Sequence, residues 1–508
     1  MTSRTAHQST INAPAILSRI ESDADASVGR AFVALAAEYL ARTRNRDGRV
    51  STPHTAAGLS ARFDEPLPLE GRDIDDILTR LRADVIAESN HLWHPRYLGH
   101  QLAGPLPAAV WTESVTAALN QSLAVFEMSP VMTVLEHRVI KWMTTLAGLG
   151  QESGGTLTSG GTEATFTALL AARGAILPDA WMNGVGSDPP VLLCGEHAHY
   201  AVTRAAAELG LGMRNVLPVR SRDYRMDTDA LRGALGEMAR RGRRVMAVVA
   251  SSGSTATGSF DDLETIAALC DQHGTWLHVD AAHGGSALLS RRHRVRLKGI
   301  ERARSVAWDP HKILLIPTQA GVLLMRDERD LDAAFSQRAP YLFQTSATER
   351  NWDQGTRNFM CSRRAEVLKV WVALQRYGAD ALGGMYDYLC DLTRLMYDDI
   401  QERSDFVAMH EPESNILCFR YVGNGTRSDD ELDRINRDLR DRYNLSGEGW
   451  ITATNLDGRR VLRVTIMNPR TTPSDVRDVL DGLAAVGRSL ELRSIFTGQP
   501  QTSAPDDE

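Results

Sequence analysis

The sequence contains few cysteines and no long apolar run. Its 5 cysteines, in a chain of 508 residues, are scattered, odd in number and never spaced as Cys-x-x-Cys, which is typical of a reduced compartment. No stretch approaches the roughly 18 apolar residues that a membrane span needs. Residues 1–17 also lack the apolar core of a secretory signal. We therefore expect a cytoplasmic protein with no membrane partner and no metal site.

A basic excess is absent as well. The chain has 57 Lys and Arg against 64 Asp and Glu, and its formal net charge is -7. Nucleic acids and anionic membranes are usually bound by basic surfaces, so we expect a small-molecule partner and no nucleic acid. A chain of 508 residues that is 43% hydrophobic exceeds the usual size of one domain, and two or three lobes are expected.

One lysine follows a short apolar run and a turn. Residues 305–308 are Ser-Val-Ala-Trp, and Asp309, Pro310, His311 and Lys312 come next. A lysine amine that can lose its proton forms a Schiff base with a carbonyl cofactor. Taken alone, Lys312 is better explained as a surface residue after a turn.

Two upstream segments favour a reactive lysine. Residues 245–250 and 276–279 are apolar runs that stop at small or polar residues, as buried parallel strands do, and ligands bind at the carboxyl ends of such strands. Asp280 directly follows the second run. A carboxylate there can pair with a protonated pyridine nitrogen, so Asp280 and Lys312 together indicate pyridoxal phosphate.

A glycine-rich segment precedes an expected helix at residues 156–164. Gly160 and Gly161 allow a tight turn with exposed amides, and a helix N-terminus attracts phosphate. Ser159 and Thr162 add hydroxyl donors. In isolation the pattern also fits an ordinary capped helix start.

Apolar spacing predicts helices elsewhere in the chain, over residues 28–42, 74–86 and 107–119. Asp261 and Glu264 have the spacing of a capping box. We therefore expect Asp261 to be a structural residue at the start of a helix.

From about His94 to Asn468 these ordered motifs resemble the group II pyridoxal-phosphate-dependent amino acid decarboxylases, the family of glutamate, aromatic amino acid and diaminobutyrate decarboxylases. The resemblance implies an α/β enzyme of fold type I, aspartate-aminotransferase-like, with a mainly parallel central sheet flanked by helices. It also implies a homodimer, across which the N-terminal part packs. The expected parts are an N-terminal helical segment at 1–93, a large cofactor domain at 94–378, a small α+β domain at 379–498 and a disordered tail at 499–508.

The resemblance also assigns roles to single residues. His199, preferred over His197, aligns with the histidine that stacks on the cofactor ring, and Tyr341 aligns with a tyrosine that protonates the substrate carbon. Arg463 lies among apolar neighbours, a costly place for an unpaired cation, and aligns with the arginine that grips the substrate α-carboxylate. The expected set comprises catalytic Lys312, His199, Tyr341 and Asp280, cofactor-binding Ser159, Gly160, Gly161, Thr162, His199, Thr255, Asp280, Ala282, His311 and Lys312, and substrate-binding His94 and Arg463.

Residues expected to set specificity resemble more than one subfamily. Residues 120–122 resemble diaminobutyrate decarboxylases, and residues 126–128 resemble glutamate decarboxylases. His283 stands where the family commonly has an aromatic residue, and it alters the pocket or merely packs.

We expect decarboxylation of an L-amino acid to a primary amine and carbon dioxide, with a glutamate-like or diaminobutyrate-like substrate preferred. The presence of Tyr341 favours this plain decarboxylation, because relatives that oxidise amino acids to aldehydes often lack the tyrosine. The alternatives are an aminotransferase or oxidative decarboxylase-deaminase of the same fold, or a non-catalytic homologue that binds the cofactor.

Overall fold

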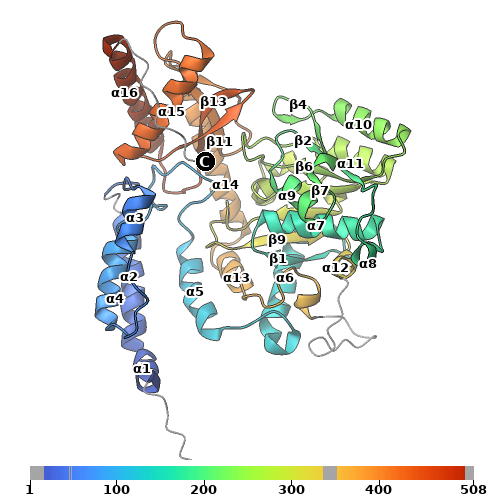
Figure 1. The fold of residues 1–508 in the computed structure, drawn as a ribbon, viewed down its shortest axis with the longest axis horizontal. Helices are drawn as coiled ribbons and strands as arrows, with labels where there is room; N and C mark the ends of the chain where they lie inside the picture. Colours follow the sequence, from blue (N-terminus) through green and yellow to red (C-terminus); the bar gives the residue numbers. More distant parts are fainter. Residues whose placement is uncertain (1–15, 45, 47, 336–351, 498–508) are drawn as a thin grey trace, which may run out of the picture. The chain divides into compact units, whose positions relative to one another are not determined.

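The computed structural model describes residues 16–44, 46, 48–335 and 352–497 (Figure 1). Tyr341 and the expected tail at 499–508 lie outside these residues. The chain divides between His94 and Pro95 into an N-terminal unit, residues 1–94, and a larger unit, residues 95–508. The further boundary expected at residues 378 and 379 stays a prediction.

The N-terminal unit is helical. Its helices are α1 (Ile16–Asp23), α2 (Ala26–Arg44), α3 (Ala56–Arg62) and α4 (Ile74–Arg80), which continues as a π-helical stretch (Leu81–Ile86). The helices expected over 28–42 and 74–86 are therefore present. Within α2 only Leu35 and Thr43 are buried, and α1, α3 and α4 bury no residue. These helices have almost no core of their own.

A seven-stranded sheet organises the larger unit (Figure 1). Its strands lie in the order β1-β9-β8-β7-β6-β2-β3. The strands are parallel from β8 through β3, whereas β9 runs antiparallel to both β8 and β1. The strand bounds are β1 Gly154–Thr158, β2 Val191–Gly195, β3 Val216–Val219, β6 Val245–Ser251, β7 Trp276–Asp280, β8 Ser305–Trp308 and β9 Gly321–Met325. The expected α/β fold with a mainly parallel sheet is confirmed.

Both faces of this sheet are buried, which explains its uninterrupted apolar strands. In β6, Val248 and Ala250 belong to one apolar cluster, and Met246 and Val249 belong to another. Helices α6 (Pro130–Leu146) and α11 (Leu263–His273) contribute to the first cluster. Helices α7 (Gly161–Ile176) and α9 (Ala201–Glu208) contribute to the second. The helices thus form a layer on each face.

The remaining elements before residue 402 connect or flank this sheet. Helix α5 spans the residues expected from the sequence. The bounds are α5 Pro107–Leu119, α8 Ala180–Asn183, β4 Ser221–Arg222, β5 Arg225–Met226, α10 Thr228–Arg240, α12 Arg329–Ala334, α13 Val367–Tyr377 and α14 Ala379–Gln401, with short 3-10 helices at Phe126–Met128, Met213–Asn215, Gly284–Leu289, Arg294–Leu297, Ile300–Arg302 and Gln354–Thr356.

The C-terminal part carries a second, antiparallel sheet. Its strands lie in the order β10-β11-β13-β12, and helix α15 contacts β13 and helix α16. Ser428 and Glu431 form a complete capping box at the start of α15. The bounds are β10 Phe406–Ala408, β11 Ile416–Tyr421, α15 Asp429–Ser446, β12 Thr452–Leu456, β13 Arg459–Thr465 and α16 Pro473–Thr497.

The helix cap expected at Asp261 is wrong by one residue. Asp262 caps α11, accepting a bond from the Thr265 amide at 3.1 Å. Asp261 is buried and accepts from the Met226 and Ser251 amides, each at 2.7 Å. Burial raises the pKa of Asp261 to about 6. Because the Asp261 carboxylate is occupied by these long-range hydrogen bonds, the neighbouring Asp262 caps the helix.

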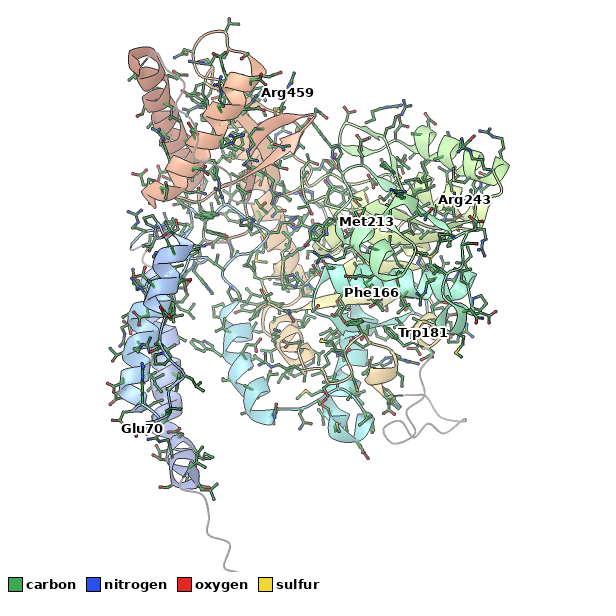
Figure 2. All side chains as sticks on the ribbon, viewed as in Figure 1. Glu70, Phe166, Trp181, Met213, Arg243 and Arg459 are labelled. Carbon is green, nitrogen blue, oxygen red and sulfur yellow. The ribbon has the colours of Figure 1, made fainter. Side chains whose placement is uncertain are left out.

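Arg243 and Arg459, both labelled in Figure 2, form side-chain hydrogen bonds. Arg243 donates to Asn215 at 2.9 Å, and Arg459 donates to Asp429 at 3.2 Å. Among the residues with described positions, no helix has the length and apolar character needed to cross a bilayer.

Candidate active site

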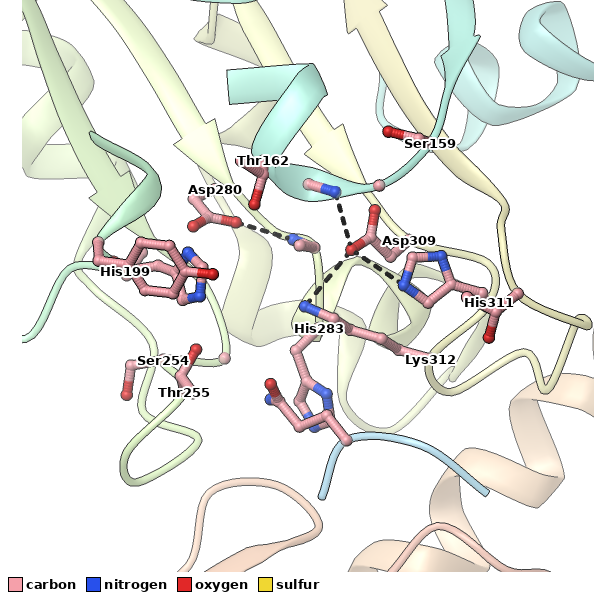
Figure 3. A pocket seen from close by; sticks show the side chains of 18 of the residues that line it. Ser159, Thr162, His199, Ser254, Thr255, Asp280, His283, Asp309, His311 and Lys312 are labelled. Carbon is pink, nitrogen blue, oxygen red and sulfur yellow. Dashed lines mark hydrogen bonds and ion pairs between the residues drawn. The ribbon is translucent and has the colours of Figure 1, made fainter. Parts of the chain in front are cut away.

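A cavity of about 390 Å³ lies at the carboxyl ends of the central parallel strands. It is lined by Ser251 at the end of β6 and by Asp280 at the end of β7, and strands β6, β7 and β8 are neighbours in the sheet. Ligands bind at such strand ends in open α/β sheets. The expected site residues that line the cavity are Ser159, Gly160, Gly161, Thr162, His199, Thr255, Asp280, Ala282, His311 and Lys312 (Figure 3).

A tight turn after β8 presents Lys312. The Lys312 amide donates to the Asp309 carbonyl at 3.0 Å, and the His311 amide donates to the Ala320 carbonyl at 3.1 Å. The Asp309 amide donates to the Ala282 carbonyl at 3.0 Å, so this turn is fixed to the loop that follows β7. Lysine and aspartate positions 32 residues apart in the chain, Lys312 and Asp280, therefore face one cavity.

Asp309 is a site residue that the sequence analysis did not single out. Its carboxylate is 2% exposed, and its Oδ2 lies 3.4 Å from Lys312 Nζ and 3.6 Å from His311 Nε2. The same oxygen accepts from the Gly161 amide at 3.0 Å (Figure 3). Asp309 thus connects the lysine turn to the start of helix α7. Its position three residues before Lys312 was the available signal.

Asp280 and His199 lie on different elements of the cavity wall. Asp280 Oδ1 accepts from the Ala282 amide at 3.2 Å, which orients the carboxylate at the strand end. His199 Nδ1 accepts from the Ala201 amide at 3.2 Å, so its neutral form carries the proton on Nε2. Burial is the main cause of the lowered His199 pKa, and the Asp280 charge partly opposes it.

The glycine-rich start of α7 has the shape of an anion cradle. A Cβ on Gly161 would lie 2.8 Å from the Ala282 Cβ and 3.1 Å from Asp309 Oδ2, so only glycine fits this close approach. Ser159 and Thr162 bring hydroxyl groups to the same cavity. Helix N-termini with free donors favour phosphate groups. A phosphate there would share the helix start with the Asp309 carboxylate.

Two expected residues, Arg463 and His94, are not among the described residues that line this cavity, and a third, Tyr341, cannot be placed. Arg463 is buried on β13, burial lowers its pKa, and its Nε has no hydrogen-bond partner. Its charge nevertheless lowers the pKa of His283, which does line the cavity. His94 is the buried last residue of the N-terminal unit, and Tyr341 lies outside the described residues. The roles of all three stay predictions.

Several lining residues were missed because they lack a local motif. Most of them lie on loops that only the folded chain brings together. His283 had been named for a possible effect on the pocket, and Tyr200 and Asp309 are the other titratable residues among them. The cavity residues outside the expected set are Gln101, Tyr200, Ser251, Gly253, Ser254, His283, Asp309, Thr318 and Gln319.

A lysine, a carboxylate at a strand end and a glycine-rich helix start, all on a mainly parallel sheet, together define the class of pyridoxal-phosphate enzymes. The donor set fits that cofactor: hydroxyls and a helix start suit its phosphate, Asp280 suits its ring nitrogen, and Lys312 suits its aldehyde. Within the described residues, no group of three or more His, Cys, Asp or Glu is arranged to hold a metal ion.

The chain belongs to the pyridoxal-dependent decarboxylase family, because residues 57–422 match that family's conserved domain. It is 34% identical over 429 residues to L-2,4-diaminobutyrate decarboxylase of Rhizobium meliloti, covering 84% of this chain and 85% of the relative. It is 33% identical over 439 residues to acidic amino acid decarboxylase GADL1 of Mus musculus, covering 84% and 80% of the two chains. The chain is thus a pyridoxal-phosphate-dependent carboxy-lyase acting on amino acids.

Solved structures show the same architecture. The crystal structure of mouse CSAD in apo form matches with a TM-score of 0.85 at 30% identity, covering 93% of this chain and 99% of that one. The glutamate decarboxylase domain of a diaminobutyrate-pyruvate transaminase and L-2,4-diaminobutyrate decarboxylase from Vibrio parahaemolyticus matches with a TM-score of 0.80 at 26% identity, covering 90% and 95%. The expected fold, family and cofactor are confirmed.

Proposed function

We propose that this enzyme converts an L-amino acid with a short polar side chain, acidic or diamino, into a primary amine and carbon dioxide. The observation that supports the reaction is the convergence of Lys312, Asp280 and the start of α7 on one cavity. The substrate class follows from the relatives, whose names specify acidic amino acids and L-2,4-diaminobutyrate.

Asp280 and Lys312 divide the cofactor chemistry between them. When bound, the cofactor supplies an electron-withdrawing ring that takes up the electron pair released as carbon dioxide leaves. Asp280 holds the proton on the ring nitrogen by an ion pair, because a carboxylate favours the charged form of its partner. Lys312 would hold the cofactor through its amine.

Other residues orient the substrate. Arg463 binds the α-carboxylate with its planar fork. This binding offsets the cost of a buried cation that has no ion pair among the described residues. His199 would hold the cofactor ring, and His94 would contribute to the substrate pocket. Tyr341 returns a proton to the substrate carbon, as a weak acid can.

We further propose that the enzyme acts in the cytoplasm as a homodimer. The family resemblance and the N-terminal unit support the dimer, because the described helices of that unit bury few of their apolar residues. Small domains with little core need a partner for stability. Size-exclusion chromatography with light scattering tests the stoichiometry.

The central test is Lys312→Ala. We expect loss of carbon dioxide release from every amino acid and loss of the visible absorbance of the bound cofactor. Lys298→Ala is the matched control, because Lys298 is an exposed lysine paired with Glu264 at 2.9 Å, and it should keep both signals. Retained turnover in Lys312→Ala would remove this lysine from the chemistry.

Product analysis separates the proposed reaction from its alternatives. The proposed enzyme releases equal amounts of primary amine and carbon dioxide. A keto acid or aldehyde without amine would indicate an aminotransferase or oxidative deaminase. Cofactor binding without carbon dioxide release from any common amino acid would indicate a non-catalytic homologue.

A further inference from the structure

His283 is a buried histidine in the wall of the active-site cavity. It follows Ala282 in the loop after β7 and is 3% exposed. Its Nε2 lies 2.8 Å from Asn415 Oδ1, whereas its Nδ1 is buried without a hydrogen-bond partner. Figure 3 shows the ring beneath the Lys312 side chain. A buried polar atom without a partner is costly and calls for an explanation.

Asn415 determines which nitrogen of His283 carries the proton. Asn415 Nδ2 donates to the Ile466 carbonyl at 3.0 Å, and the Ile466 amide donates to the Asn415 carbonyl at 2.9 Å. The Asn415 amide is therefore fixed with its oxygen toward His283. An amide oxygen only accepts, so His283 Nε2 must donate, and Nδ1 of the neutral ring is left as a bare acceptor.

The surroundings keep this ring neutral. Burial is the main cause that lowers the pKa of His283 to about 3, and the charges of Lys312 and Arg463 lower it further. The hydrogen bond to Asn415 raises it only in part. At neutral pH the wall of the cavity therefore contains a fixed, buried acceptor near Lys312, which is proposed to hold the cofactor, and Arg463, which is proposed to hold the substrate's α-carboxylate.

We propose that His283 Nδ1 accepts a hydrogen bond from the side chain of the substrate, so that the enzyme selects amino acids whose side chain carries an N–H or O–H donor. This inference rests on the proposed decarboxylation and narrows its substrate class. An amide or ammonium side chain satisfies Nδ1. A side-chain carboxylate or sulfinate can only accept hydrogen bonds. Its oxygen lone pairs would repel the lone pair on His283 Nδ1.

Shape-matched substrates isolate this hydrogen bond. Glutamine and glutamate have the same size, but only glutamine carries a side-chain donor. 2,4-Diaminobutyrate and norvaline form a second pair, with an ammonium and a methyl group at the same position. Sites built to bond a donor discriminate against analogues that lack it, and we expect at least a roughly tenfold preference for the donor in one of these pairs.

Two substitutions separate the two nitrogens of His283. In His283→Gln the longer amide can still donate to Asn415 but leaves no acceptor at the Nδ1 position. In His283→Asn the shorter amide can place an oxygen at the Nδ1 position but does not reach Asn415. His197→Gln is the matched control, because His197 does not line the cavity. Circular dichroism and cofactor absorbance verify that each variant is folded and loaded.

Each enzyme is mixed with each amino acid, and dissociation constants are taken from the change in cofactor absorbance alongside kcat/KM. We expect His283→Gln to lose about tenfold of the donor preference, while His283→Asn and His197→Gln keep it within about threefold. An unchanged preference in His283→Gln, or a wild-type preference for glutamate over glutamine and no preference for 2,4-diaminobutyrate over norvaline, overturns the inference.

The absorbance measurement needs no turnover, so the two proposals fail separately. Selective binding without carbon dioxide release overturns the decarboxylation and supports the acceptor role of His283. Carbon dioxide release with equal binding of both members of each pair supports the decarboxylation and overturns the acceptor role of His283. Whether glutamine or 2,4-diaminobutyrate binds more tightly then tells whether the donor is neutral or cationic, and either result supports the acceptor.

Discussion

Two buried arginines of the larger unit differ in whether the chain supplies their counterion. Arg363 forms two bonds to Glu136 of helix α6, at 2.7 and 2.9 Å, with side chains 3% and 0% exposed. On β13, Arg463 is also buried, at 8% exposed, but no carboxylate among the described residues forms an ion pair with it. Arg363 thus has a counterion within the chain, whereas Arg463 is available to bind the anionic group of a ligand.

Two buried histidines repeat this contrast. His278, within β7, has both ring nitrogens occupied, by Ser305 Oγ at 2.9 Å and Thr165 Oγ1 at 3.4 Å. His283, five residues later, has one nitrogen occupied and one without a partner. Buried polar groups are normally satisfied. An unsatisfied group in a residue of the cavity wall, such as His283 Nδ1, is therefore a candidate to bind a ligand.

The largest effect is expected when the buried pair of Glu136 and Arg363 is broken. In Glu136→Gln the Arg363 cation remains buried without its counterion, and the free energy of unfolding should fall by about 4 kcal/mol. Denaturant unfolding measures this change. Glu237→Gln removes a surface partner of Arg241 and should change stability by less than about 1 kcal/mol. Equal losses in the two variants would contradict the contrast.

Acid should lower the free energy of unfolding through both His278 and His283, although the hydrogen-bond partners of the two rings differ. Burial is the first cause that lowers the pKa from 6.5 to about 4 for His278 and to about 3 for His283. The unfolded chain therefore binds protons first, so stability is full above about pH 6.5 and falls as the pH decreases toward these values. The loss reaches about 3 kcal/mol for His278 by pH 4.

Unfolding curves between pH 7 and pH 4 test this expectation. His278→Gln and His283→Gln should each show a shallower decline than the wild type. If only one of them does, the two rings differ in burial and not merely in their partners.

Cofactor binding should stabilise the region around the cavity. At a free concentration of 100 times its dissociation constant, pyridoxal phosphate should raise the free energy of unfolding by about 2.7 kcal/mol. Thermal unfolding with and without the cofactor measures the gain. This gain should persist in Glu136→Gln and shrink in Lys312→Ala. The opposite pattern would mean that the cofactor's binding energy depends on the Glu136–Arg363 pair.

The smallest effect concerns the open arginine. In Arg463→Leu we expect the substrate KM to rise about 30-fold, which corresponds to about 2 kcal/mol of lost carboxylate binding. Stability should stay unchanged or increase, because an unpaired buried cation is removed. Arg463→Lys keeps the charge but loses the planar guanidinium group. Its KM should therefore lie between those of the wild type and Arg463→Leu. A large loss of stability with unchanged KM would make Arg463 structural.

Local patterns were sufficient to predict much of the cofactor side of the site. The apolar run before Asp280, the turn before Lys312 and the glycines before α7 each combine a structural signal with a chemical group within a few residues. The residues whose roles the sequence left open or misassigned depend on distant partners. His283, whose role was left open, bonds Asn415, which is 132 positions away, and Asp261 was misassigned as a helix cap because its amide partners are not visible from spacing.

By itself, the sequence determined the parallel strands, the glycine-rich helix start and the lysine turn, because periodicity and turn chemistry act over a few residues. Only the tertiary structure decided which buried polar groups are satisfied and which remain open. That distinction depends on pairs such as Glu136 with Arg363, which close across 227 positions, and on the orientation that Ile466 imposes on Asn415. Burial makes each unsatisfied group costly, so the fold, rather than the motif, reveals where the substrate is expected to bind.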